Sequence, residues 1–328
     1  MITTECINLL ENKIKYKKIA VIGDLMLDGY FWGDVTRISP EAPVPVVEIE
    51  NEFFRFGGAA NVALNLLKLG ADAIPIGTIG NDTEGKVFLD LLNQNSITSK
   101  GIFVDSSRPT STKTRVIAKN QQVVRIDKES KEFIKSSLEK NIIDLLKENI
   151  SELDGIILQD YNKGVLTPKI IKESIKLALN NSKIISVDPK FLNFKLYKNT
   201  TLFKPNRKET EDILGIRISS DSEISKAGNE LLKLLKSKYV LLTLGDKGSA
   251  LFEKGKNVIR IPTKARKVAD VSGAGDTVIA VITAALCAGA SITEAAYISN
   301  YAGGLVCEEV GIVPIDKENL FSELRKDI

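Results

Sequence analysis

The chain has 328 residues, of which 43% are hydrophobic and 27% charged, a composition typical of a globular protein with a large core. Its net charge of +3 is too small to indicate nucleic-acid binding, and its lysines are scattered rather than clustered. It contains no histidine, which excludes Ser-His-Asp catalysis, Cys-His catalysis and histidine-ligated zinc.

The first part of the chain alternates strand patterns with helical ones. Residues 3–15 predict a short helix, and residues 18–23 form a continuous apolar run, which is typical of a strand buried on both faces. Helices are expected at 58–69 and at about 83–95, with a strand at 73–77 between them.

The same alternation continues towards the C-terminus. Strands are expected at 154–158, 183–187 and 239–243, and helices at 168–180, 207–214, 223–237, 272–289 and about 293–308. Alternation of this kind indicates a mainly parallel sheet with helices on both faces, so the predicted fold class is α/β.

Two stretches interrupt this alternation. Residues 33–56 contain prolines followed by β-type residues, and residues 110–127 alternate with period two. We expect antiparallel strands that form a small β-strand lid, at about 33–56 and 108–127, on a single domain of residues 1–328. An ordinary edge hairpin is the alternative. An exposed lid sheet has an edge and an apolar face to protect, which favours a homodimer formed through the lid.

Residues 270–277 place Asp276 directly after a small glycine-rich turn, and an apolar helical run follows. A glycine turn that opens a helix presents unpaired backbone N–H groups at the positive end of the helix dipole, which is an anion site. A carboxylate beside such a site suggests a base that deprotonates a hydroxyl next to a bound phosphate. The alternative is a tight turn followed by a favourable first-turn charge.

Polar residues recur where the predicted strands end, at the edge where open α/β sheets bind ligands. They are Asp24, Asp28, Asp160, Asp188, Lys190, Asn206, Glu209, Thr243, Gly245 and Gly248. Each alone is more often a turn residue than a ligand. Asn206 and Glu209 lie three apart on one helix face, and their oxygens suit hydrated Mg²⁺. An N-cap with its capping-box partner is the alternative for this pair.

Three motifs stand out: residues 57–61 (Gly-Gly-Ala-Ala-Asn), 206–209 (Asn-Arg-Lys-Glu) and 270–276 (Asp-Val-Ser-Gly-Ala-Gly-Asp). Together they resemble the ribokinase-like (phosphofructokinase-B) family of carbohydrate kinases, over nearly the whole chain. Residues 21–28, 37–46, 120–122, 125–127, 160–164 and 187–190 resemble those members that phosphorylate D-glycero-β-D-manno-heptose 7-phosphate.

The resemblance implies a ribokinase-like three-layer αβα core. It implies transfer of the γ-phosphoryl group of ATP to the anomeric C1 hydroxyl, giving heptose 1,7-bisphosphate on the ADP-heptose route to lipopolysaccharide. Asp276 would be the base, and the N–H groups of Gly273, Ala274 and Gly275 would stabilise the developing charge.

The resemblance also implies two binding sites. The nucleotide and Mg²⁺ site would comprise Asn206, Glu209, Thr243, Leu244, Gly245, Gly248 and Asn300, with Mg²⁺ at Glu209 through water and K⁺ near Asp270. The sugar site would comprise Asp24, Asp28, Gly57, Gly58, Asn61, Arg115, Asn120, Gln122, Asp160, Lys163 and Lys190. A lid that closes on the substrate would exclude water and limit ATP hydrolysis.

Two alternatives to a heptose phosphate kinase remain. One is another sugar kinase of the family, for ribose or another phosphosugar, and the other is a catalytically inactive sugar- or nucleotide-binding homologue. A dinucleotide-dependent oxidoreductase is disfavoured, because Gly-x-Gly-x-x-Gly does not follow the first strand.

Many heptose kinases of this kind carry an adenylyltransferase domain with a His-x-Gly-His motif. Because this chain has no histidine, we expect a separate adenylyltransferase. The three cysteines fit neither a disulfide framework nor a zinc site, and neither a signal peptide nor an apolar run of membrane-spanning length is visible. The expected location is the cytoplasm.

Overall fold

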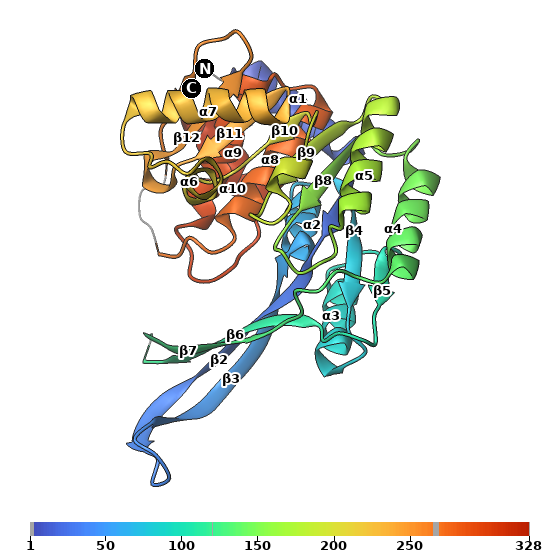
Figure 1. Ribbon diagram of the computed structural model, residues 1–328. Helices are drawn as coiled ribbons and strands as arrows, with labels where there is room; N and C mark the ends of the chain where they lie inside the picture. The colour runs from blue at the N-terminus through green and yellow to red at the C-terminus, as the bar shows by residue number, and fades with distance from the viewer. Residues whose placement is uncertain (1–2, 120, 265–268, 328) are drawn as a thin grey trace.

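The computed structural model describes residues 3–119, 121–264 and 269–327. A nine-stranded sheet with helices on both faces forms the core, and a separate four-stranded sheet projects from it (Figure 1). The predicted α/β class is confirmed. Among the helices described, none has both the length and the apolarity needed to cross a membrane.

The helices alternate with the strands along most of the chain. The helices are α1 (Thr4–Lys13), α2 (Ala59–Lys68), α3 (Thr83–Gln94), α4 (Ser136–Asn149), α5 (Pro168–Asn180), α6 (Arg207–Leu214), α7 (Asp221–Leu235), α8 (Ala274–Ala288), α9 (Ile292–Val306) and α10 (Lys317–Lys326). The strands are β1 (Lys18–Gly23), β2 (Leu25–Ile38), β3 (Pro45–Gly58), β4 (Asp72–Ile79), β5 (Ile102–Val104), β6 (Ser111–Ala118), β7 (Gln121–Lys128), β8 (Gly155–Gln159), β9 (Ile184–Asp188), β10 (Leu202–Phe203), β11 (Tyr239–Thr243), β12 (Ser249–Glu253) and β13 (Ile259–Ile261).

The core sheet has the strand order β13-β12-β11-β10-β9-β8-β1-β4-β5 and is parallel except for β12 and β13. The residues of β1 explain why this strand lies in the interior of the sheet. Ile19 and Val21 pack into one hydrophobic cluster and Ala20 and Ile22 into the other, so both faces of the strand are buried. The carboxyl ends of β1, β8, β9, β10 and β11 therefore meet at one edge of the sheet.

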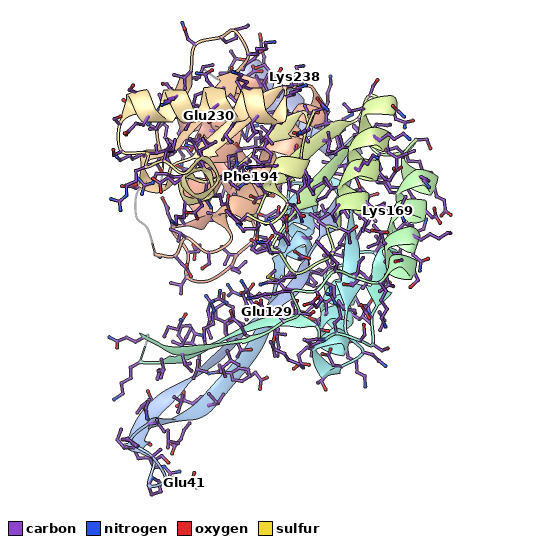
Figure 2. The ribbon with its side chains drawn as sticks, viewed as in Figure 1. Glu41, Glu129, Lys169, Phe194, Glu230 and Lys238 are labelled. Atoms are coloured by element: carbon purple, nitrogen blue, oxygen red, sulfur yellow. The ribbon has the colours of Figure 1, made fainter. Side chains whose placement is uncertain are left out.

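The four-stranded sheet, here called the arm, has the order β3-β2-β6-β7. β2 pairs antiparallel with β3 and parallel with β6, and β6 pairs antiparallel with β7. The arm extends well away from the core, with Glu41 at its far tip (Figure 2). It is a sheet of its own, so the edge-hairpin alternative is wrong. Its first strand begins at Leu25, earlier than the expected residue 33, because the apolar segment that follows β1 is already paired with β3.

Helix α8 brings the glycine turn to the carboxyl edge of the core sheet. The helix is apolar on all sides and almost entirely buried, as expected of a helix enclosed by other elements. It packs against α2 and α9, and it also contacts β8 and β9. At Gly303 of α9, an added Cβ would lie 2.7 Å from Val278, so only glycine permits this close approach of α9 to α8.

Candidate active site

The glycine turn and the first turn of α8 form one wall of the site. Gly273 is the N-cap residue with φ 80°, a left-handed conformation that glycine adopts without strain, and no described side chain caps the helix. The start of α8 therefore offers amide groups and the positive end of the helix dipole to an anion. The Ala274 amide is partly engaged, because it donates to the carbonyl of Val271 at 3.4 Å.

Asp276 lies in the first turn of α8 and is 2% exposed. Three side chains donate hydrogen bonds to its carboxylate. Asn61 donates to Oδ2 at 2.9 Å, and Gln159 and Tyr161 donate to Oδ1 at 3.0 and 2.8 Å. These bonds fix the carboxylate from α2 on one side and from the end of β8 on the other.

Burial raises the pKa of Asp276 to about 7. The hydrogen bonds from Asn61 and Tyr161 and the positive charge of Lys204 favour the ionised form, whereas the charge of Asp188 disfavours it. A carboxylate with a pKa near the working pH is an efficient general base, because it is substantially ionised and still basic enough to take a proton. The geometry therefore suits the base predicted at this position.

Gln159 and Tyr161 were not predicted as site residues. Asp160, which lies between them, was the predicted site residue, but side chains at the end of a strand alternate in direction. Gln159 and Tyr161 point towards Asp276, whereas Asp160 accepts hydrogen bonds from Tyr197 and from Asn193. Alternation along β8 was the available signal for this difference.

A cavity of about 460 Å³ opens in front of the glycine turn. Its volume lies within the range of small-molecule sites in proteins. The residues that line it are Tyr161, Asp188, Lys190, Lys204, Asn206, Thr243, Gly245, Asp246, Gly248, Thr263, Val271, Ala274, Gly275, Val278, Asn300, Gly303, Gly304 and Cys307. It joins the start of α8 to the carboxyl ends of β9, β10 and β11.

A buried ion pair lines this cavity, close enough to Asp276 to act on its pKa. Lys204 Nζ lies 3.0 Å from Asp188 Oδ2, and the two side chains are 3% and 8% exposed. A Cβ on Gly275 would lie 3.5 Å from the same ammonium, so Lys204 is next to the glycine turn. Lys204 was not predicted as a site residue, because a lysine before Pro205 gives no local sign that the fold will bury it.

Asn206 and Glu209 form a reciprocal capping box at the start of α6, as the alternative interpretation predicted. The Glu209 amide donates to Asn206 Oδ1 at 2.8 Å, and the Asn206 amide donates to Glu209 Oε2 at 2.9 Å. Lys190 pairs with the other oxygen, Oε1. Asn206 and Lys190 line the cavity, so the cap and the cavity share residues.

The structure brings most of the remaining predicted nucleotide residues to the cavity wall. Thr243, Gly245, Gly248 and Asn300 line it, whereas Leu244 is buried in the hydrophobic core. The Asn300 amide donates to the carbonyl of Pro262 at 2.9 Å. A binding role for these residues stays a prediction.

Asp24 was predicted to hold a sugar, but its carboxylate is already engaged. It accepts from the backbone amides of Tyr161 at 2.8 Å, Lys163 at 3.0 Å and Val165 at 3.1 Å. Burial, followed by the charge of Asp160, raises the pKa of Asp24 to about 6. This geometry favours a role in holding the 160–165 loop in place.

Replacing Asp24 with Asn is therefore expected to lower the free energy of unfolding by about 1–3 kcal/mol, because at least one buried backbone amide would lose its acceptor. Denaturant unfolding of the variant measures this loss. If Asp24 only contacted the sugar, its replacement would raise KM and leave the unfolding midpoint unchanged. That result would contradict the role of Asp24 in holding the loop.

Asp28 lies at the base of the arm and is 2% exposed. Arg115 Nη1 donates to its Oδ1 at 2.5 Å, but burial still raises the pKa of Asp28 above its usual value. The adjacent glycines allow this packing. A Cβ on Gly57 would collide with Asp28 Oδ2, and Gly58 has φ 58° and lies against the carbonyl of Asp24. The glycine pair thus permits a close backbone approach to Asp28 and to the Asp24 carbonyl, and its role in sugar binding stays a prediction.

The other predicted sugar residues are spread over the arm and the loops. Asn61 uses its amide nitrogen to orient Asp276, and Lys163 pairs with Glu129 at 2.6 Å where the arm meets the core (Figure 2). Gln122 is exposed on β7. Asn120 lies outside the described residues.

Asp270 accepts hydrogen bonds from the amides of Ser272 at 2.9 Å and Gly311 at 3.1 Å. In the part of the chain that the structure describes, no group of three or more acidic or cysteine side chains is arranged to hold a metal ion. The K⁺ predicted near Asp270 stays a prediction.

An α/β core with a buried carboxylate, a helix start that can face an anion and an adjoining cavity is an arrangement that suits a phosphotransferase. A family model described as pfkB family carbohydrate kinase matches residues 16–318. The chain therefore belongs to the pfkB family of carbohydrate kinases, whose members are phosphotransferases with an alcohol group as acceptor.

The chain is 44% identical over 295 residues to the "Bifunctional protein HldE" of Helicobacter pylori strain J99, which covers 90% of this chain and 64% of that protein. The protein of the same name from Desulfatibacillum aliphaticivorans is 40% identical over 308 residues, covering 94% of this chain and 63% of that protein. The chain thus spans somewhat less than two thirds of the length of these relatives.

Solved structures share the fold at lower sequence identity. Arabidopsis thaliana ribokinase complexed with ribose and ATP superposes with a TM-score of 0.74 at 22% identity, covering 93% of this chain and 98% of that one. Escherichia coli phosphofructokinase-2 in complex with substrates and products gives a TM-score of 0.76 at 18% identity, covering 94% and 99%. These likenesses confirm the ribokinase-like fold.

Proposed function

We propose that this chain transfers the γ-phosphoryl group of ATP to the anomeric C1 hydroxyl of D-glycero-β-D-manno-heptose 7-phosphate, giving heptose 1,7-bisphosphate for ADP-heptose synthesis. The observation that carries the kinase assignment is Asp276, buried, oriented by three donors and placed at the helix start beside the cavity. The sugar assignment rests on the resemblance of the arm and loop motifs to heptose phosphate kinases, and the 44% identity to an HldE protein supports it.

The residues of the chain have separate tasks in this reaction. Asp276 takes the proton of the acceptor hydroxyl as the oxygen attacks the terminal phosphorus of ATP. Lys204 and the amides at the start of α8 provide positive charge for the phosphoryl group in transit. Asn61, Gln159 and Tyr161 hold the base in one orientation, so that little reorganisation is needed during the transfer.

Mg²⁺ fits beside the Asn206–Glu209 pair. The nearby donors are carboxylate and amide oxygens, which suit a cation that keeps several of its waters. In the structure Glu209 and Asp188 are each paired with a lysine, Lys190 and Lys204. These carboxylates would hold the ion mainly through water, and the ion would neutralise phosphate charge. K⁺ near Asp270 is the second cation that we propose.

The arm is proposed to act as a lid and as a dimer surface. Val124 and Ile126 on β7 are 48% and 54% exposed, and β3 and β7 are the outer strands of the arm among the residues that the structure describes. Association of two arms would cover both features. Sedimentation of the intact chain is expected to give the mass of a dimer, and Ile126→Lys is expected to give a monomer. A monomeric parent chain would contradict this proposal.

A panel of acceptors tests the function. Purified protein and ATP are incubated separately with heptose 7-phosphate, ribose, fructose 1-phosphate and other phosphosugars, and the products are resolved by mass. We expect heptose 1,7-bisphosphate to form fastest. Faster turnover of another sugar would establish a different kinase of the family, and absence of transfer to any acceptor would favour an inactive homologue. The use of ATP suits the cytoplasm, and a separate adenylyltransferase stays a prediction.

A further inference from the structure

Helix α2 is buried along nearly all of its length, yet it carries two asparagines on one side. Asn61 and Asn65 lie one helical turn apart and are 1% and 0% exposed. Burying an amide costs free energy unless its nitrogen and its oxygen are both paired. Asn61 donates to the Asp276 carboxylate, and Asn65 bonds to Asn61 in turn, so Asn65 acts on the base at one remove.

The oxygen of Asn65 is fixed by a donor that cannot change its role. The backbone amide of Ile315 donates to Asn65 Oδ1 at 2.9 Å, and the Thr277 hydroxyl donates to the same oxygen at 3.1 Å. A backbone N–H group only donates, so the end of the Asn65 amide that faces Ile315 must be the oxygen. The amide nitrogen of Asn65 therefore points away from Ile315, along α2 towards Asn61.

This nitrogen bonds to Asn61 twice. Asn65 Nδ2 donates to the Asn61 carbonyl at 2.9 Å and to Asn61 Oδ1 at 3.3 Å. The second bond gives the Asn61 side chain a direction, because its oxygen faces Asn65 and its nitrogen is left to face Asp276, donating to Oδ2 at 2.9 Å. The reverse direction would set two donors against each other at one end and an oxygen against a carboxylate at the other.

The direction of the Asn61 amide matters for the ionisation of Asp276. Burial raises the pKa of Asp276 most strongly, and the hydrogen bond from Asn61 is the largest influence that lowers it. An amide oxygen in place of the nitrogen would favour the protonated carboxyl, which cannot act as a base. The other charged or titratable groups that act on this carboxylate are Asp188, Tyr161, Lys190 and Lys204.

We propose that Asn65 is a positioning residue for the transfer reaction. By donating to Asn61 Oδ1, it keeps the nitrogen of the Asn61 amide, and not the oxygen, against Asp276. The inference rests on the proposed function, because it takes Asp276 as the base. Ile315 precedes α10 and Thr277 belongs to α8, so contacts from both elements fix the direction of one amide on α2.

An isosteric replacement separates this role from simple packing. Asn65→Asp keeps an oxygen for Ile315 and Thr277 but puts a second oxygen in place of the nitrogen. Asn61 would then turn round to donate to residue 65 and would present its own oxygen to Asp276. Asn65→Ser is a neutral second variant, which also loses the nitrogen but adds no buried charge.

Asn149→Asp is the matched control. Asn149 lies on α4 and is 8% exposed, and its nitrogen donates to the carbonyl of Leu145, four residues earlier, at 2.7 Å. The bond from Asn65 to the Asn61 carbonyl has the same spacing. The control therefore loses a comparable local bond and gains a comparable buried carboxylate, but it is not part of the site described above.

The dependence of kcat/KM on pH is measured for each folded protein, with ATP and the best acceptor of the panel. Asn65→Asp is expected to move the rise of kcat/KM upward by about one to two pH units, the equivalent of losing a hydrogen bond to a charged group. At pH 7 this shift lowers kcat/KM about 5- to 50-fold, whereas at high pH the parent value should be approached. A damaged fold would instead lower kcat/KM at every pH. Asn65→Ser should shift the rise by less, and Asn149→Asp should leave it unchanged.

A double-mutant cycle distinguishes the direction of the amide from the new charge at position 65. Asn61→Ala removes the amide in between, so Asn65→Asp then acts on Asp276 through its charge alone. We expect the shift caused by Asn65→Asp to be much smaller in the Asn61→Ala background than in the parent chain. An equal shift in both backgrounds would overturn the proposal. If Asn65→Asp does not fold, Asn65→Ser takes its place in the cycle.

A titration of the Asp276 carboxyl, followed by carbon NMR in the protein without ligands, gives a readout that needs no turnover. The Asp276 signal is the one missing from Asp276→Asn. Its pKa should be higher in Asn65→Asp than in the parent chain and unchanged in Asn149→Asp. Absence of kinase activity would refute the proposed function but leave this titration valid. An unchanged pKa of Asp276 in both Asn65 variants would refute the positioning role and leave the kinase function standing.

Discussion

Replacing Asp276 with Asn is expected to lower kcat by about 10²- to 10⁴-fold, the usual contribution of proton transfer by a positioned side chain. The amide has nearly the same shape as the carboxylate, so Asn61, Gln159 and Tyr161 would still surround it. What is lost is the capacity to accept the proton of the acceptor hydroxyl. Steady-state kinetics with saturating ATP and heptose 7-phosphate measure the effect.

Asp90→Asn is the matched control, because Asp90 is an exposed carboxylate on α3. It should leave kcat unchanged. Far-ultraviolet circular dichroism should show that both variants are folded. Turnover of Asp276→Asn within a few-fold of the parent chain would remove Asp276 from the mechanism.

The pH dependence of the parent chain provides a related result. Because the pKa of Asp276 is raised to about 7 and the ionised form is the base, kcat/KM should increase as pH rises through about 7 and level off above it. Asp276 gives the free energy of unfolding the opposite pH dependence to that of kcat/KM. Its pKa is higher in the folded than in the unfolded chain, so its contribution to stability is present at low pH and is lost as pH rises towards 7.

Replacing Lys204 with Met is expected to have the second large effect. The change leaves Asp188 buried without its cation, which typically costs about 3–5 kcal/mol of stability. It also removes a positive charge that lowers the pKa of Asp276. The rise of kcat/KM with pH should therefore move above pH 7, and kcat should fall because the glycine turn loses the neighbouring ammonium.

The double variant Lys204→Met with Asp188→Asn distinguishes the effects of the unpaired Asp188 from those of losing the ammonium itself. Asp188 raises the pKa of Asp276 and Lys204 lowers it, so removing both should return the pH dependence towards that of the parent chain. Much of the lost stability should also return, because no buried charge is left unpaired. If Lys204→Met had the parent stability and the parent pH profile, the buried pair would have neither assigned role.

Local patterns were enough to predict much of the fold. The apolar run at β1, the capping box of Asn206 and Glu209 and the glycine turn before α8 each depend on a few neighbouring residues, and each appears as expected. The start of β2 was harder to predict. A single residue, Asp24, separates β1 in the core from β2 in the arm, so no loop signal marks the change of sheet.

The site depended more on distant contacts. Asp276 was identifiable from its turn, but the residues that orient it come from α2 and from the end of β8, more than 100 residues away along the chain. Asp24 shows another gap. A carboxylate after a strand predicted a sugar ligand, but that pattern could not reveal that three backbone amides of another loop donate to it.

The most direct test of the central claim is a crystal structure of the chain with a non-hydrolysable ATP analogue and heptose 7-phosphate. We expect the triphosphate in the cavity with its terminal phosphate at the start of α8, and the C1 hydroxyl within about 2.6–3.2 Å of the Asp276 carboxylate. A C1 hydroxyl held by another group, with Asp276 remote from both ligands, would contradict the mechanism.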